Sequence, residues 1–122
     1  MSIRQTFTLT IKDDAGRVVA TDESAQLGDD LAQFSETSPA SGNVTVPVVV
    51  PVADIIGFWV ISDQDVTMLE NVADLSHALV ANVPFWWHLG QGACPFTVDI
   101  ATLKFTNAGL VDANVKGAIL SA

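Results

Sequence analysis

Residues Val44 to Ile61 read VTVPVVVPVADIIGFWVI, an apolar stretch long enough to resemble a membrane-spanning helix. Pro47 and Pro51 would each interrupt the hydrogen bonds of such a helix, and Asp54 would carry a carboxylate into lipid. Two buried strands that meet at Ala53 and Asp54 explain the stretch better. We therefore expect β-structure here and no association with a membrane.

The chain downstream of residue 43 continues as a series of short apolar segments separated by turn residues. Turn signals occur at residues 63–65, 90–92 and 107–109. The predicted strands are Val44–Val52, Ile55–Ser62, Val66–Glu70, His77–Ala81, Phe85–Leu89, Phe96–Thr106 and Ala113–Leu120. Strands at this spacing predict an all-β fold, an antiparallel β-sandwich or jelly roll, with residues 1–122 as a single domain. Only Val72–Val80 also shows some helical periodicity.

The N-terminal segment alternates with period two. Apolar residues and Gln5 occupy the odd positions from Ile3 to Ile11, and Thr and basic residues occupy the even ones. Turn residues at 13–16 and an apolar return over Arg17–Thr21 predict a β-hairpin. The following segment, Asp22–Gly42, is rich in acids, Ser and Gly, so we expect a long acidic loop with one helical turn near Asp29–Phe34.

The composition limits the classes of function. Fourteen acidic and five basic residues give a formal charge of −9, and the bases are scattered along the chain. Binding to phosphates needs clustered Lys or Arg, so we expect no direct contact with nucleic acid. Cys94 is the single cysteine, which excludes an internal disulfide. The N-terminus lacks the pattern of a signal peptide, so we expect synthesis in a reducing cytoplasm.

Two predicted strands carry bulky apolar residues on both faces. Neighbouring side chains of a strand point to opposite sides, so Phe58 and Trp59 are separated, as are Trp86 and Trp87, with His88 on the side of Trp86. A sandwich with a wet exterior does not need such residues outside. These five residues are therefore our candidate interface, to be covered by the acidic loop, another subunit or a ligand.

For the Asp-rich turn at residues 63–65 we prefer a structural explanation to a functional one. Asp63 and Asp65 resemble the start of a calcium-binding loop, but the remaining ligands and the Gly of that motif are missing. Asp between strands is common in turns. We expect no metal and no cofactor.

Catalytic motifs are equally weak. Asp74, Ser76 and His77 are close in sequence, but a triad is a spatial arrangement, and no G-x-S-x-G motif is present. Cys94 lies six residues from His88, and a Cys–His nucleophile pair stays open as the lowest-ranked hypothesis. We expect the protein not to be an enzyme.

The segment from Phe58 to the C-terminus resembles a family of small virion proteins of tailed bacteriophages. The matching segments are FWVISDQDVTMLEN (Phe58–Asn71), VPFWWHLG (Val83–Gly90) and PFTVDIATLKFTN (Pro95–Asn107). The resemblance implies a capsid decoration (cement) protein or another head or tail accessory protein. It implies no enzymatic activity and no cofactor.

Our leading hypothesis from the sequence is a virion structural protein that binds the major capsid protein, or another virion protein, and stabilises the assembled shell. We expect it to be a homo-oligomer, with a trimer favoured, located in the virion after synthesis in the host cytoplasm. The alternative is a carbohydrate-binding β-sandwich that uses Trp59, Trp86 or Trp87 as a sugar platform. Against it, the chain lacks Tyr and the sequence shows no obvious cluster of polar side chains beside those Trp residues.

Overall fold

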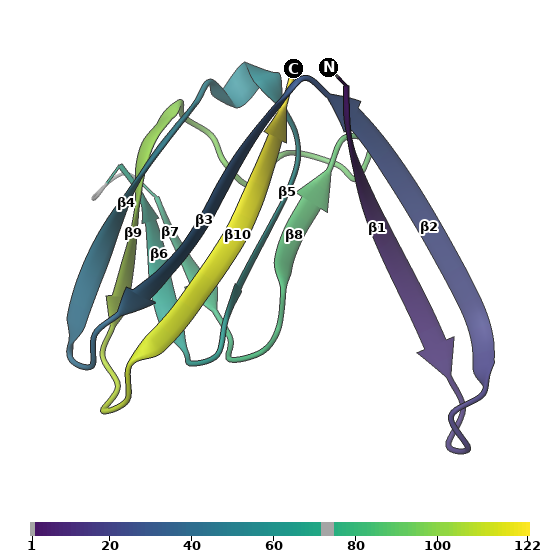
Figure 1. Cartoon of the computed structure of the whole chain (residues 1–122), viewed down its shortest axis with the longest axis horizontal. Helices are drawn as coiled ribbons and strands as arrows, with labels where there is room; N and C mark the ends of the chain where they lie inside the picture. Colours follow the sequence, from purple (N-terminus) through teal and green to yellow (C-terminus); the bar gives the residue numbers. More distant parts are fainter. Residues whose placement is uncertain (1, 72–74) are drawn as a thin grey trace.

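Eight antiparallel strands pair in a nested order in the computed structural model, which describes residues 2–71 and 75–122 (Figure 1). The strands are β3 (Asp30–Ser38), β4 (Gly42–Val50), β5 (Ile55–Ser62), β6 (Val66–Glu70), β7 (Ser76–Leu79), β8 (Phe85–His88), β9 (Ile100–Asn107) and β10 (Ala113–Ser121). β3 pairs with β10, β4 with β9, β5 with β8, and β6 with β7. This order is that of one long hairpin rolled onto itself, which is a jelly roll.

Two further pairings join these pairs into sheets. β10 also pairs with β5, and β6 also pairs with β9. The result is two four-stranded sheets, with orders β3-β10-β5-β8 and β4-β9-β6-β7, which face each other in Figure 1. The predicted all-β sandwich is confirmed.

The core lies between the two sheets and is built from alternate residues of the strands. Its largest fully buried apolar side chains are Phe58, Phe96, Phe105, Met68, Ile100, Leu103 and Ile119. Buried polar groups at one end are satisfied: the Ser38 hydroxyl donates to the Phe105 carbonyl at 2.9 Å, and the Asn107 amide donates to the Val111 carbonyl at 2.7 Å. Each bond removes the penalty of burying an unpaired polar group.

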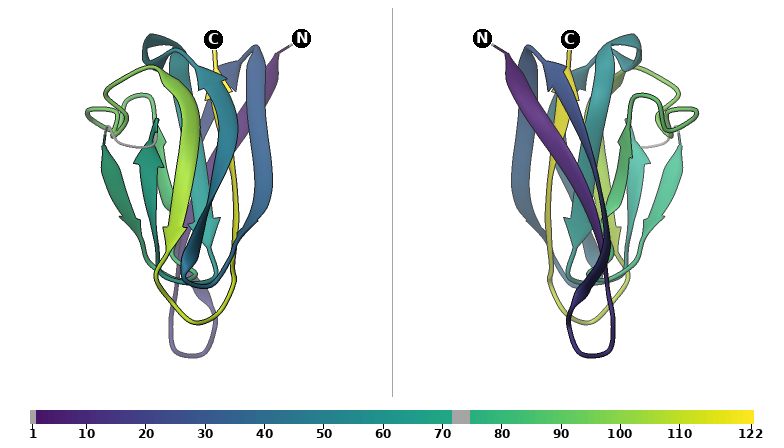
Figure 2. Two further views of the ribbon diagram at one scale, coloured as in Figure 1. Left: turned by 90° about the vertical axis from the view of Figure 1, so that its left-hand side faces the viewer. Right: turned by 90° about the vertical axis from the view of Figure 1, so that its right-hand side faces the viewer.

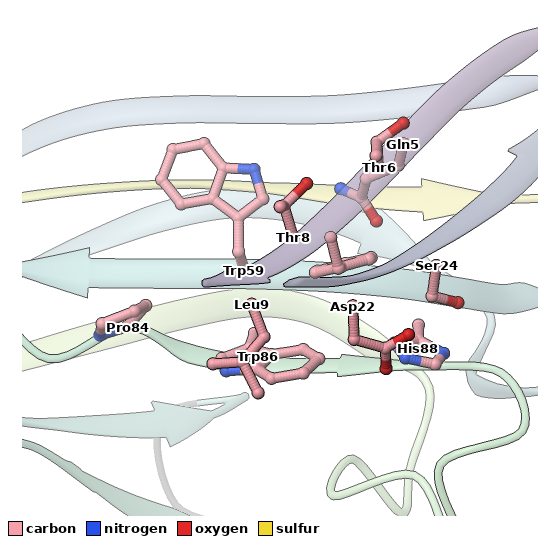
Figure 3. Close-up of a pocket in the computed structure, with 11 residues that line it drawn as sticks. Gln5, Thr6, Thr8, Leu9, Asp22, Ser24, Trp59, Pro84, Trp86 and His88 are labelled. Atoms are coloured by element: carbon pink, nitrogen blue, oxygen red, sulfur yellow. The ribbon is translucent and has the colours of Figure 1, made fainter. Parts of the chain in front are cut away.

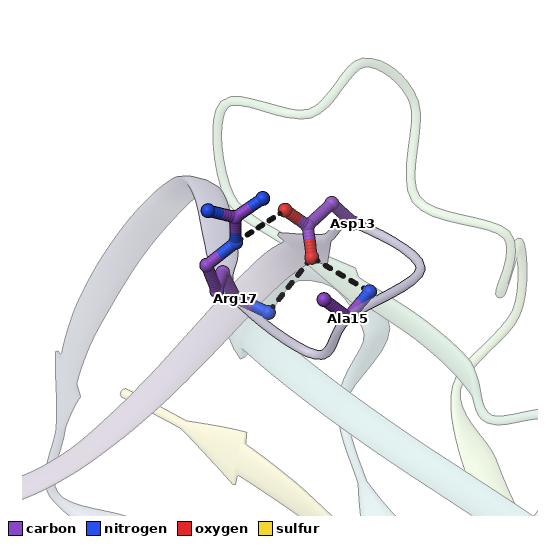
Figure 4. Close-up of polar contacts among 3 residues, drawn as sticks. All are labelled: Asp13, Ala15 and Arg17. Carbon is purple, nitrogen blue, oxygen red and sulfur yellow. Dashed lines mark hydrogen bonds and ion pairs between the residues drawn. The ribbon is translucent and has the colours of Figure 1, made fainter.

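β1 (Ile3–Lys12) and β2 (Val18–Gly28) form a separate two-stranded sheet that projects from the sandwich. We call this hairpin the arm. It diverges from β8 in Figure 1, and its turn reaches beyond the ends of the sandwich strands in Figure 2. The turn is closed by Asp13, whose carboxylate accepts hydrogen bonds from the Ala15 and Arg17 backbone N–H groups and pairs with the Arg17 guanidinium at 2.9 Å (Figure 4). The predicted N-terminal hairpin is therefore present.

The expected acidic loop over Asp22–Gly42 is wrong, as is the helical turn near Asp29–Phe34. β2 continues to Gly28, and Asp30–Ser38 is β3, a sandwich strand that pairs along its whole length with β10. Polar residues hid the alternation, because β3 is an edge strand and one of its buried positions is Ser38, a small polar residue. Only Phe34 gives the strand a large buried side chain.

The remaining strand predictions agree with the structure to within a few residues. Ile55–Ser62 and Val66–Glu70 match in full, whereas the strand expected from Phe96 begins only at Ile100. Of the uncertain segment Val72–Val80, residues 76–79 form β7 and residues 72–74 lie outside the described residues. The described part of the chain contains no helix with the length and apolar character needed to cross a membrane.

Gly117 makes the close approach of β10 to its neighbours possible, and we expect its substitution to be costly. A Cβ atom there would lie 2.6 Å from the Trp59 carbonyl oxygen and 2.7 Å from Cζ of Phe34. Gly117→Ala should therefore lower the free energy of unfolding by about 1–3 kcal/mol, as overpacking does, in urea denaturation. Lys116→Ala, next to it with an exposed side chain, should change it by no more than about 0.5 kcal/mol. Equal effects of the two variants would contradict this account of the β10 packing.

Candidate functional site

The candidate interface residues divide between the core and the outer face of one sheet. Phe58 is fully buried and Trp87 is 6% exposed, and both belong to the core cluster. Their neighbours Trp59 and Trp86 point outward and are direct cross-strand partners on β5 and β8. The predicted separation of adjacent aromatic residues is thus present, but Phe58 and Trp87 are packing residues. Trp59, Trp86 and His88 remain as surface candidates.

The part of the arm around Phe7 on β1 and Gln26 on β2 covers part of this outer face. The Phe7 ring lies 5.3 Å from the rings of both Trp86 and His88, and Trp86 and His88 are themselves stacked at 5.8 Å. The Gln26 amide donates to the Leu89 carbonyl at 3.2 Å. Sequence analysis missed these contacts because they join residues that are more than 60 positions apart.

Gly57 lets the arm come close to β5. A Cβ atom at this position would lie 2.5 Å from Oε1 of Gln5 and 3.3 Å from the Phe7 ring. Gln5 Oε1 is buried there and has no hydrogen-bond partner within the described part of the chain. An unpaired buried carbonyl oxygen opposes docking of the arm, so the stacking around Phe7 must outweigh it.

A groove of about 520 Å3 lies between the arm and the outer face of β5 and β8 (Figure 3). Its apolar lining consists of Phe7, Leu9, Trp59, Pro84 and Trp86. Its polar lining consists of Gln5, Thr6, Thr8, Asp22, Ser24 and His88. This volume is within the range of small-molecule sites in proteins.

The groove overturns one expectation from the sequence, namely that no polar cluster lies beside the exposed Trp residues. Asp22 and Ser24 are on β2, and they reach the groove because the segment assigned to a loop is a strand of the arm. Asp22 is the one charged carboxylate of the lining, and none of the lining residues is Lys or Arg. The site therefore takes most of its polar groups from the arm and its two indoles from the sheet, and no Lys or Arg lines it.

The Asp residues of the 63–65 turn accept hydrogen bonds from neighbouring segments of the chain. Asp63 accepts hydrogen bonds from the Asn114 backbone N–H at 2.8 Å and from its side-chain amide at 3.1 Å. Asp65 accepts one from the Ala81 N–H at 2.8 Å. Among residues 2–71 and 75–122, no group of three or more His, Cys, Asp or Glu is placed to hold a metal ion.

The weak catalytic candidates are engaged elsewhere. His77 pairs with Glu70, and Asp74 lies outside the described residues. His88 packs with Phe7 and Trp86 on the outer face, whereas Cys94 packs against the buried core. Burial raises the pKa of the Cys94 thiol, and a hydrogen bond from the Phe96 backbone acts in the opposite direction. A thiol with a raised pKa is a poor nucleophile at neutral pH.

Sequence analysis missed a buried polar pair, Glu70 and His77. Glu70 is fully buried, its Oε2 lies 2.8 Å from Nε2 of His77, and its Oε1 has no hydrogen-bond partner in the described part of the chain. The His77 ring packs between Phe85 at 5.1 Å and Phe96 at 5.6 Å. The signal was in the sequence, because period two from Val66 through Met68 places Glu70 on the buried face of β6.

Comparison of the chain with known protein families, with curated proteins and with solved structures found no match to any of them.

We expect His77→Ala to be strongly destabilising, because it leaves the Glu70 carboxylate buried without its partner. The free energy of unfolding in urea should fall by about 3–5 kcal/mol, as it does when one member of a buried pair is removed. The double variant Glu70→Met, His77→Leu removes both polar groups and should recover most of that loss. If His77→Ala lowers the free energy of unfolding by less than the double variant does, the two side chains do not form a buried pair.

Cys94 should react slowly with alkylating agents in the folded protein. A raised pKa means that less of the thiol is thiolate at about pH 8, and thiolate is the reactive form. Iodoacetamide labelling followed by mass spectrometry should be slower than for free cysteine and should reach the free rate in denaturing urea. Folded protein labelled as fast as free cysteine would show an activated thiol.

Proposed function

We propose that the protein is a structural subunit of a bacteriophage virion, a decoration protein that binds the assembled shell and associates with copies of itself. The observation that carries this proposal is the arm. It carries exposed apolar side chains between Leu9 and Val19, on either side of the turn that projects beyond the sandwich strands in Figure 2: Leu9 is 59% exposed, Ile11 54% and Val19 66%.

An arm of this kind is poorly suited to a protein that acts alone. A two-stranded hairpin is marginally stable in water by itself, and each strand of the arm has one unpaired edge. Exposed apolar surface on such an edge invites pairing with another chain. A subunit of an assembly hides this surface when it joins its partners.

The charge distribution favours contact through the arm over contact through the sandwich. Residues 1–28 hold three of the five basic residues and four of the fourteen acids. The rest of the chain holds two bases and ten acids, so two sandwiches repel each other more than a sandwich repels an arm. The bacteriophage assignment itself is supported by the resemblance of Phe58–Asn71, Val83–Gly90 and Pro95–Asn107 to the family described above.

The energetics favour binding to a repetitive partner. Burying roughly 400 Å2 of apolar surface gives about 10 kcal/mol at 25 cal/mol per Å2. The loss of free motion on association opposes binding by about 4–15 kcal/mol. One contact is therefore marginal, but several made at once on a shell, by a trimer for example, reinforce each other.

Virions of the phage that encodes the chain, purified on a density gradient, provide the direct test of this function. Quantitative mass spectrometry should find the protein in a fixed ratio to the major capsid protein. Its absence from such virions, or its origin in a genome without phage structural genes, would refute the assignment.

The surface of the arm is tested by introducing one negative charge at an exposed Val residue, either on the arm or away from it. Val19→Asp should abolish self-association, as measured by sedimentation velocity. The variant should also fail to stay on shells in a pelleting assay, while the thermal midpoint of the sandwich stays unchanged. Val49→Asp, on β4 and 79% exposed, makes the same change away from the arm and should behave as wild type.

Added salt should not dissociate the wild-type protein. An apolar contact persists in 1 M NaCl, whereas exposed ion pairs weaken as the Debye length falls from about 10 Å at 0.1 M to about 3 Å at 1 M. A wild-type protein that stays monomeric without binding shells, or that leaves them in 1 M NaCl, would contradict contact through the arm.

A further inference from the structure

The groove beneath the arm has features that assembly through the arm tip does not explain. Trp59 and Trp86 lie side by side on the outer face of the sheet, and Trp86 is 37% exposed although it is large and apolar. Within residues 2–71 and 75–122, neither indole N–H donates a hydrogen bond to a protein acceptor. Buried or half-buried Trp usually finds such an acceptor, so these two donors are available to a ligand.

The wall opposite the indoles supplies acceptors and further donors. Asp22 points toward the groove in Figure 3. Among the described residues, its carboxylate is hydrogen-bonded only through Oδ1, which accepts from the Glu23 N–H. The hydroxyls of Thr8 and Ser24 and the amide of Gln5 line the same space. Six of the eleven lining residues are polar, which is more than an apolar docking groove for a partner strand needs.

We propose that this groove binds an uncharged oligosaccharide. The apolar C–H face of a pyranose ring fits against an indole, while its hydroxyl groups both donate to carboxylate or amide oxygens and accept from N–H and O–H groups. A small number of placed polar groups on an otherwise aromatic surface is the usual composition of a ligand site of this volume.

The charge of the site selects against acidic sugars. No Lys or Arg lines the groove, Asp22 contributes a negative charge, and the chain carries a formal charge of −9. A sialylated or uronic-acid chain would therefore approach an unfavourable potential without a cation to pair with. Uncharged glucose-, xylose- or N-acetylglucosamine-type chains are left as the ligand class.

A second copy of the chain is the competing occupant of the groove. The exposed apolar residues at the far end of the arm, Ile11, Val18 and Val19, do not line the groove. The surface proposed for assembly and the sugar site are therefore largely separate, and Leu9 is the one exposed arm residue that belongs to both.

The test is a titration of the purified full chain with malto-, cello-, xylo- and N-acetylchito-oligosaccharides. Binding is measured by calorimetry and by the change in Trp fluorescence. Oligogalacturonate and sialyllactose serve as anionic probes. At least one uncharged series should give saturable binding that shifts the Trp emission, and the anionic probes should bind at least about tenfold more weakly. No saturable binding of any uncharged probe up to about 10 mM would overturn the proposal.

Variants locate the site. Trp59→Phe removes an indole N–H, and Asp22→Asn replaces a carboxylate oxygen with an amide NH2 group. Neither change touches the Phe7 stack, and each should weaken binding about tenfold or more. Trp86→Ala should abolish it. Leu110→Ala, on the loop before β10 and 92% exposed, should bind as wild type. Binding that survives all three groove variants would overturn the proposal.

Sedimentation of the same variants separates the two occupants. If Trp59→Phe or Asp22→Asn abolishes self-association, the groove is filled by a second copy, and the sugar assignment is wrong. Association that persists while sugar binding is lost supports the groove as a sugar site. The result for Val19→Asp is independent of either outcome.

Discussion

The pairing of β5 with β8 is the constraint on which both the core and the surface of this protein depend. Alternation along a strand sends Phe58 and Trp87 into the core and leaves Trp59 and Trp86 on the other side. No choice of register buries all four, because a shift by one residue exchanges the two sets. The fold therefore must carry two large indoles outside, and the arm, whose Phe7 packs on Trp86, covers part of that face.

That cover is partial, and the partial cover creates the groove. The arm contacts the sheet through the ring of Phe7, the amide of Gln26 and the gap left by Gly57, and then it diverges. A hairpin packed along its full length would have no groove beneath it and no apolar tip to offer. The groove and the exposed apolar residues of the arm thus both follow from the way the arm diverges from the sheet.

The sequence was sufficient to predict the strands with large apolar residues and the separation of adjacent aromatics, because period two is visible wherever one face is apolar. It was insufficient for β3, where Ser38 occupies a buried position and only Phe34 is large. The same loop assignment also covered the second half of β2, which carries Asp22 and Ser24, so the polar side of the groove could not be found. The Glu70–His77 pair was missed for a different reason. A carboxylate at a buried position of a strand is rare, so the residue type of Glu70, the last residue of β6, gives no reason to expect it in the core.

The contacts that hold the arm also determine what its two surfaces can do. Phe7 stacks on Trp86, which lines the groove, and Leu9, one alternation further along β1, is exposed and lines the groove as well. Any change that moves Phe7 on Trp86 therefore changes the width of the groove and the direction of the arm tip together. The proposed ligand between Trp86 and the arm and the proposed partner at the arm tip would both act on the contact between Phe7 and Trp86. If each favours a different arm angle, their binding free energies are coupled, and reciprocity requires that each change the affinity of the other by the same factor.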